Sequence, residues 1–107
     1  METVYDKEIV EEWLNRLSAS VLVKMKDAMD AVSMKSSLDE TINDMKQAAL
    51  NAKKSVIDEE IEEAKGTISN ENIWLKGSST VEERELHSEN IATLTYYIDK
   101  LEEMKDE

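Results

Sequence analysis

The sequence predicts an all-α fold, an up-down-up bundle of three long helices with a short helical turn between the second and the third. Apolar residues recur every three or four positions over long stretches, which is the helical period. Proline is absent, and the two glycines both lie in the second half of the chain. A chain of 107 residues can bury roughly 60–70% of the surface that its unfolded form exposes. We therefore expect a single helical domain over residues 1–107.

The first helix is expected from about Thr3 to Ser33. Apolar side chains advance from Val10 to Val32 in steps of three or four residues, which places them on one face of a helix. Such a helix is on the order of 45 Å long, at about 1.5 Å per residue. Its weak point is at Ser18, because serine side chains compete for backbone hydrogen bonds. We expect one helix that can kink there.

The second helix is expected to begin after Ser37, which forms the spacing of a capping box with Glu40. Apolar residues then continue at helical spacing, and the stripe shifts by one residue, or about 100° of rotation, at Val56-Ile57. This shift indicates that the helix faces two neighbours. A lysine followed by a glycine is typical of a helix end, so we expect the helix to end at Lys65-Gly66.

The segment from Thr67 to Thr80 is dense in turn-forming residues. We expect a short helical turn from about Asn70 to Lys76, closed by Gly77. Thr80 and Glu83 repeat the capping-box spacing and should begin the last long helix. Its apolar face follows heptad spacing over about two heptads, through His87, Ile91, Leu94, Ile98 and Leu101.

Composition limits the classes of function. With 25 acidic and 13 basic residues the net charge is −12, which repels phosphate backbones and anionic lipid and attracts a basic protein. We therefore expect neither direct nucleic-acid binding nor a membrane contact. No cysteine is present, so disulfides and thiolate metal sites are excluded, and a reducing compartment, by default the cytoplasm, is expected. The amino terminus shows no basic leader, and the longest aliphatic run is Val21-Leu22-Val23.

Motifs for catalysis or for metal binding are missing from the sequence. The residue three before His87, the only histidine, is Arg84, so the Glu-x-x-His pair of di-iron bundles is absent. No calcium loop, phosphate-binding loop or nucleophile elbow is found. We expect no cofactor, no metal and no enzymatic activity, although a carboxylate pair acting as acid and base has no sequence signature. His87 and Trp13 should belong to the core, and Trp74 should plug the bundle end or anchor a partner.

Carboxylates provide the candidate partner-binding site. Five of the six residues from Asp58 to Glu63 are acidic. Because a helix rises about 1.5 Å per residue, the spacing of these charges along the helix axis is close to the ~1.7 Å per charge of duplex DNA. Acidic ridges are predicted on the outer faces of the second and last helices, with Tyr96 as an exposed aromatic contact. The predicted site residues are Glu40, Asp44, Asp58, Glu59, Glu62, Glu63, Glu85, Glu89, Tyr96, Asp99 and Glu103.

Three interpretations of these features remain open. The first is an inhibitor or decoy that occupies a basic, nucleic-acid-binding surface of a partner protein such as an enzyme. In size, charge and lack of catalytic motifs the chain resembles the small acidic proteins with which phages block host defence nucleases, including anti-CRISPR proteins; this resemblance implies such a function and no particular residues. The second is a structural or adaptor bundle that self-associates, for example as a homodimer. The third is an ordinary solvated acidic surface.

Overall fold

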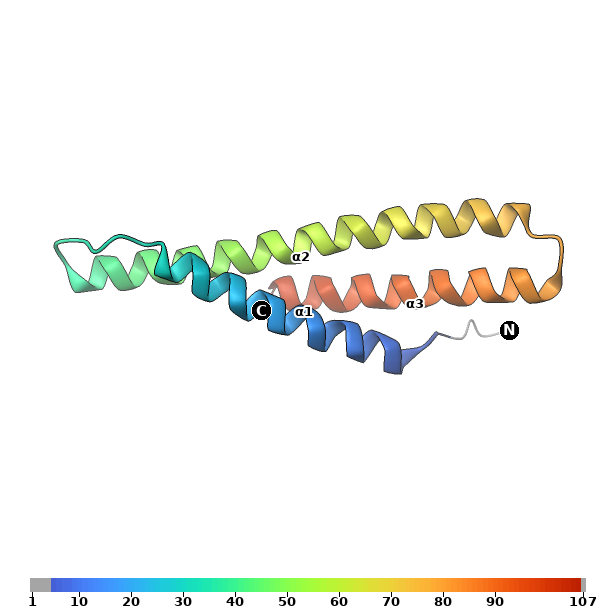
Figure 1. Cartoon of the computed structure of the whole chain (residues 1–107), viewed down its shortest axis with the longest axis horizontal. Helices are drawn as coiled ribbons and strands as arrows, with labels where there is room; N and C mark the ends of the chain where they lie inside the picture. The colour runs from blue at the N-terminus through green and yellow to red at the C-terminus, as the bar shows by residue number, and fades with distance from the viewer. Residues whose placement is uncertain (1–4, 107) are drawn as a thin grey trace.

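The structure is a computed structural model that describes residues 5–106, and within this range it consists of three α-helices. α1 spans Lys7–Asp30, α2 spans Leu38–Gly77 and α3 spans Val81–Asp106. Each helix runs antiparallel to the one before it, so the predicted all-α, up-down-up bundle is confirmed (Figure 1). All three pairs of helices are in contact.

The three helices are staggered along the molecule. At about 1.5 Å per residue, the 40 residues of α2 extend about 60 Å, whereas the shorter α1 and α3 extend under about 40 Å each. Figure 1 shows α1 along one end of α2 and α3 along the other, so that all three overlap only in the middle. The molecule accordingly measures 66 × 22 × 18 Å. The core lies at this overlap and comprises Val10, Leu17, Val21, Ile57, Ile61, Ala64, Tyr97, Ile98 and Leu101.

The predicted end of the second helix at Lys65-Gly66 is wrong. Gly66 lies inside α2, and the segment expected as a separate helical turn, Asn70 to Lys76, is the last part of the same helix. Neither Gly66 nor Gly77 has a positive φ, so neither uses the left-handed conformation that ends many helices. A glycine in a helix interior costs only about 1 kcal/mol. Packing of α3 along this part of α2 outweighs that cost.

α1 begins with the cap that its sequence allows and continues without interruption. The side chain of Asp6 accepts a hydrogen bond from the backbone N–H of Ile9 at 3.1 Å, which satisfies one of the free amides of the first turn. The helix is continuous through Ser18, so it does not break there. It ends at Asp30, three residues before the predicted Ser33. The predicted start at Thr3 lies outside the described residues.

One of the two predicted capping boxes forms, with its reciprocal bond shifted by one residue from Thr80 to Ser79. Thr80 accepts a hydrogen bond from the backbone N–H of Glu83 at 3.1 Å, and the Glu83 carboxylate accepts one from the N–H of Ser79 at 3.2 Å. At α2, Ser37 is the N-cap residue, but its side chain makes no capping hydrogen bond. The hydroxyl of the buried Thr41 donates instead to the carbonyl of Ser37 at 3.1 Å. The prediction of a Ser37–Glu40 capping box is therefore wrong.

Candidate functional site

A groove of about 660 Å³ lies beside the N-terminal half of α1, where the three helices overlap. Its lining comes from the stretches 6–20, 60–71 and 89–97, which belong to the start of α1, the middle of α2 and the middle of α3. At about 1.5 Å per residue the first two stretches are roughly 17–21 Å long. We call this feature the acidic groove. Its length corresponds to about three to four turns of helix.

The floor of the acidic groove is apolar and aromatic. Trp13 of α1 and Tyr97 of α3 meet edge to face, with ring centroids 5.2 Å apart. Both rings lie on the apolar stripes of their helices, and Tyr97 is only 3% exposed. Leu17, Ala64 and Leu94 also line the groove. The predicted core position of Trp13 is confirmed, because the ring packs against the buried core.

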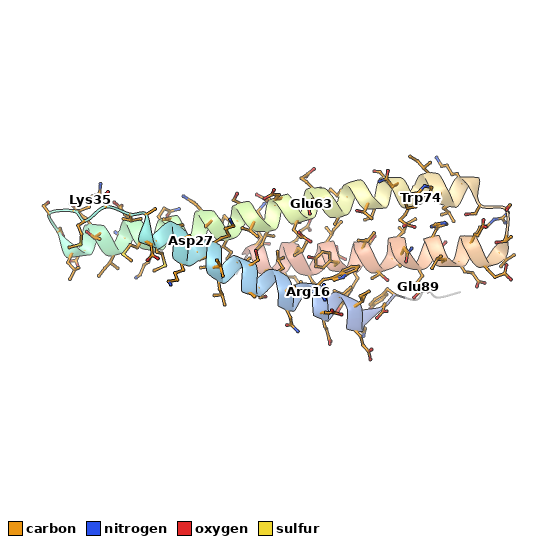
Figure 2. The ribbon with its side chains drawn as sticks, in the orientation of Figure 1. Arg16, Asp27, Lys35, Glu63, Trp74 and Glu89 are labelled. Atoms are coloured by element: carbon orange, nitrogen blue, oxygen red, sulfur yellow. The ribbon has the colours of Figure 1, made fainter. Side chains whose placement is uncertain are left out.

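Carboxylates from all three parts of the lining surround this floor. They are Asp6, Glu60, Glu63, Glu71 and Glu89. Among the described residues that line the groove, the one basic side chain is Arg16, and it forms a salt bridge with Glu12 on its own helix. Figure 2 labels Arg16, Glu63 and Glu89, one on each helix; Arg16 and Glu63 lie near the middle of the molecule, and Glu89 lies closer to the end where α2 leads to α3. The groove is therefore negatively charged around an apolar centre.

The buried phenol of Tyr97 lies beside two of these carboxylates. Its hydroxyl donates a hydrogen bond to Oε1 of Glu60 at 2.8 Å. Burial of the ring raises the pKa of Tyr97, and the hydrogen bond and charge of Glu60 and the charge of Glu63 raise it further. The negative charges of both carboxylates oppose the loss of a proton from the phenol, because the phenolate would also be negative. The same field favours a positive charge placed in the groove.

One end of the acidic groove contains a buried carboxylate. Glu71 is 7% exposed, and its Oε2 lies 2.6 Å from Nδ1 of His87. The amide of Asn90 donates a second hydrogen bond to the same oxygen at 3.3 Å. These bonds join α2 to α3 beyond Gly66. His87 is partly buried, as predicted for a residue at the edge of the core.

The chemistry of this buried group is limited. Within residues 5–106 no three histidine, cysteine or acidic side chains are arranged to hold a metal ion. Glu71 is engaged by two hydrogen-bond donors on α3, so it acts in the structure as a link between two helices.

Four of the predicted ridge carboxylates have ion-pair partners. Asp58 pairs with Lys105 of α3 at 2.6 Å, the one such pair among the predicted residues that joins two helices of the described chain. The other three pairs join residues that are close in sequence, and their N–O distances are long for an ion pair. They are Asp44 with Lys35 at 3.9 Å, Glu62 with Lys65 at 4.0 Å and Glu103 with Lys100 at 3.4 Å. All four carboxylates are at least half exposed, so salt screens these pairs strongly.

The remaining predicted carboxylates are exposed, and the structure divides them between two faces. Glu40, Glu59, Glu85 and Asp99 lie on outer surfaces. Glu63 and Glu89 line the acidic groove. By the 100° rotation per residue, Glu63 lies about 140° around α2 from Asp58 and about 100° from Glu62, but only about 40° from Glu59, which is one turn away on the same side. The structure thus places two of the eleven predicted residues in the acidic groove.

Sequence analysis missed three residues of that site, Asp6, Glu60 and Glu71. A signal for two of them was present, because Glu60 and Glu71 lie at the two ends of one stripe of α2 that runs through Ala64 and Thr67. Acidic residues at such positions are unusual on a buried face and mark a charged cavity or a paired group.

Tyr96 differs from its predicted contact role, and Trp74 differs from one of the two roles expected for it. Tyr96 is half-buried, because Tyr5 stacks on its ring with centroids 4.5 Å apart. It is therefore not an exposed anchor. Trp74 lies in the last turns of α2, is 53% exposed and approaches His87 with ring centroids 5.9 Å apart, so it does not plug the end of the bundle. Figure 2 shows Trp74 near the end of α2 that leads to α3.

No protein-family model matches the chain, and neither the curated proteins nor the solved structures contain a match. Within residues 5–106, none of the helices has an apolar stretch long enough to cross a lipid bilayer.

Proposed function

We propose that this chain is a protein-binding protein that acts as an inhibitor or decoy by occupying a basic, nucleic-acid-binding surface of a partner. The observation that carries the proposal is the acidic groove, in which five carboxylates surround an apolar floor. A basic surface that normally meets phosphates would meet carboxylates here. The action is binding without catalysis, and the setting proposed is the cytoplasm.

The distribution of charge supports this direction of binding. α1 carries five acidic and four basic side chains and is almost neutral. α2 carries nine acidic and five basic side chains, and α3 carries eight acidic and three basic ones. Most of the net charge therefore lies on the α2–α3 hairpin. Such a field accelerates encounter with a cationic partner and weakens as salt is added.

Affinity capture from a cell extract at low and at high salt tests the proposal. We expect a basic nucleic-acid-binding protein that is retained at low salt, is released as salt rises and loses its DNA or RNA when this chain binds. The triple variant Glu59→Lys, Glu62→Lys, Glu63→Lys should retain less of it. Recovery of the same partner in complex with its nucleic acid would exclude a decoy.

The alternative is an adaptor that works through self-association, and one observation favours it. Beyond the central overlap each end of the molecule has only two helices, and large apolar side chains are exposed there. These are Leu22, Val23, Met34 and Leu38 at one end, and Ile73, Trp74, Val81 and Leu86 at the other. Sedimentation at several concentrations separates the two functions, since the adaptor requires a stable dimer or larger assembly.

A further inference from the structure

We infer that the acidic groove is the receptor for one basic amphipathic α-helix of the partner, which lies lengthwise in it as a fourth helix. This inference rests on the proposed function, because the helix is taken to be the nucleic-acid-binding element of the partner. It goes further in assigning the contact to one groove and in excluding the outer ridges.

The shape of the groove favours a helix. Its lining follows about three turns of α2 and about four turns of α1, so it is a long channel along the bundle axis. A helix lying there would contact all three helices and complete a four-helix arrangement, the common way to close an open three-helix overlap. Two-stranded or globular surfaces would reach only the rim of a channel bounded by helices on both sides.

The chemistry of the groove specifies the two faces of that helix. The floor at Trp13, Leu94 and Tyr97 would receive apolar residues spaced three and four apart, the way amphipathic helices dock into grooves. Glu63 and Glu89 are exposed and border the floor on α2 and α3, so they would meet lysine or arginine on the flanks of the docked helix. Neither of these two carboxylates forms a salt bridge with a residue in the range 5–106, in contrast to Asp58 on the outer face.

A synthetic peptide provides the direct probe. The peptide is about 14 residues of lysine, leucine and alanine with leucines every third or fourth position, matched to the length of the groove. Its control is a peptide of the same composition with the leucines shuffled so that no apolar face forms. Binding is followed by the anisotropy of a fluorophore on each peptide. We expect the amphipathic peptide to bind at least about tenfold more tightly than the control.

Two variants of equal charge locate the contact. The double variant Glu63→Gln, Glu89→Gln removes one carboxylate of the groove from each of α2 and α3, and should weaken binding of the amphipathic peptide by about tenfold. The matched variant Glu62→Gln, Asp99→Asn removes one carboxylate from each of the same helices, on the side turned away from the groove by the 100° rotation per residue, and should weaken it by less than about twofold. All four side chains are exposed, so both variants should fold, as circular dichroism can verify.

The fluorescence of Trp13 gives a second readout, because it responds to a peptide in contact with the groove and not to long-range electrostatic attraction. The chain has two tryptophans, so the variant Trp74→Phe leaves Trp13 as the single indole. Its emission should shift when the amphipathic peptide covers the groove and should stay unchanged with the shuffled peptide.

The outcomes of these experiments distinguish a failure of the groove as the receptor from a failure of the proposed decoy function. Equal losses in the two double variants, or no preference for the amphipathic peptide, would overturn the groove as the receptor and leave a decoy that acts through diffuse charge. Failure of the peptide to bind at low salt would also overturn it. Peptide binding without any basic nucleic-acid-binding partner in affinity capture would support the groove and contradict the decoy.

Discussion

Replacement of Ile57 by alanine tests whether stability is concentrated where the three helices overlap. Ile57 is completely buried in the central core, as are Val10 of α1 and Leu101 of α3. Truncation of a buried isoleucine to alanine costs 2–5 kcal/mol, because apolar contact is lost and a cavity remains, and we expect about 3 kcal/mol here. A chain of this length has a free energy of unfolding of about 5–15 kcal/mol, so the loss is a large fraction.

Thermal and urea denaturation followed by circular dichroism measure this effect. A loss of about 3 kcal/mol should lower Tm by roughly 12–24 °C for a domain of this size. The matched control is Ile73→Ala, the same truncation on the same helix at a side chain that is 65% exposed, for which we expect about 0.5 kcal/mol or less. Similar losses in both variants would show that the end of the α2–α3 hairpin is packed as tightly as the centre, and the staggered arrangement would be refuted.

Three further predictions concern α2 and its contacts. Gly66→Ala should raise the free energy of unfolding by about 0.5–1 kcal/mol, because an added Cβ meets nothing within 4 Å and alanine favours a helix; a lower urea midpoint would indicate that α2 breaks there. The pKa of Tyr97 is raised in the folded state, so its contribution to stability is present below about pH 10, the ordinary value, and is lost as the pH rises above it. Ultraviolet absorption in a pH titration should show one phenol that ionises at a higher pH than the other tyrosines, and this step should be missing in Tyr97→Phe. A titration of the unmodified chain without that separate step would contradict this. His87→Ala should cost about 1–3 kcal/mol, because the buried Glu71 loses its shorter hydrogen bond, and an unchanged urea midpoint would mean that water replaces the imidazole.

The helical fold could be predicted because local sequence carries the signal for it. Apolar residues at three- and four-residue spacing placed Leu17, Ile61 and Leu101 on buried faces, and the structure buries all three. The start of α3 could also be predicted, since the Thr80–Glu83 capping box involves groups within one turn. Such features depend on neighbours in the chain, which the sequence displays directly.

Features that depend on tertiary packing were not predictable in the same way. Gly66 was expected to end a helix because glycine often does so, but the contacts that keep α2 intact come from His87 and Asn90, about twenty residues away in sequence. Likewise the stacking of Tyr5 on Tyr96 joins residues at opposite ends of the chain, and no local pattern indicates it.

The candidate site shows the same division between local and long-range information. Periodicity alone groups Asp58, Glu59 and Glu62 on one face of α2, and this grouping agrees with the exposed positions in the structure. Concavity requires the relative placement of three helices, so the groove around Glu60 and Glu63 emerged only with the fold. The strongest charge pattern in the sequence, the run from Asp58 to Glu63, is therefore divided by the fold: Glu60 and Glu63 line the groove, and the other acidic residues of the run lie outside it.

Mapping the bound peptide by nuclear magnetic resonance tests most directly whether the groove receives a basic helix. The ¹⁵N-labelled chain would be titrated with the unlabelled lysine–leucine peptide at low and at physiological salt. We predict that the perturbed signals cluster at Trp13, Leu94 and Tyr97 and persist at the higher salt concentration. Perturbations centred on Glu62 and Asp99, or spread evenly over α2 and α3 and abolished by salt, would contradict the assignment of binding to the groove.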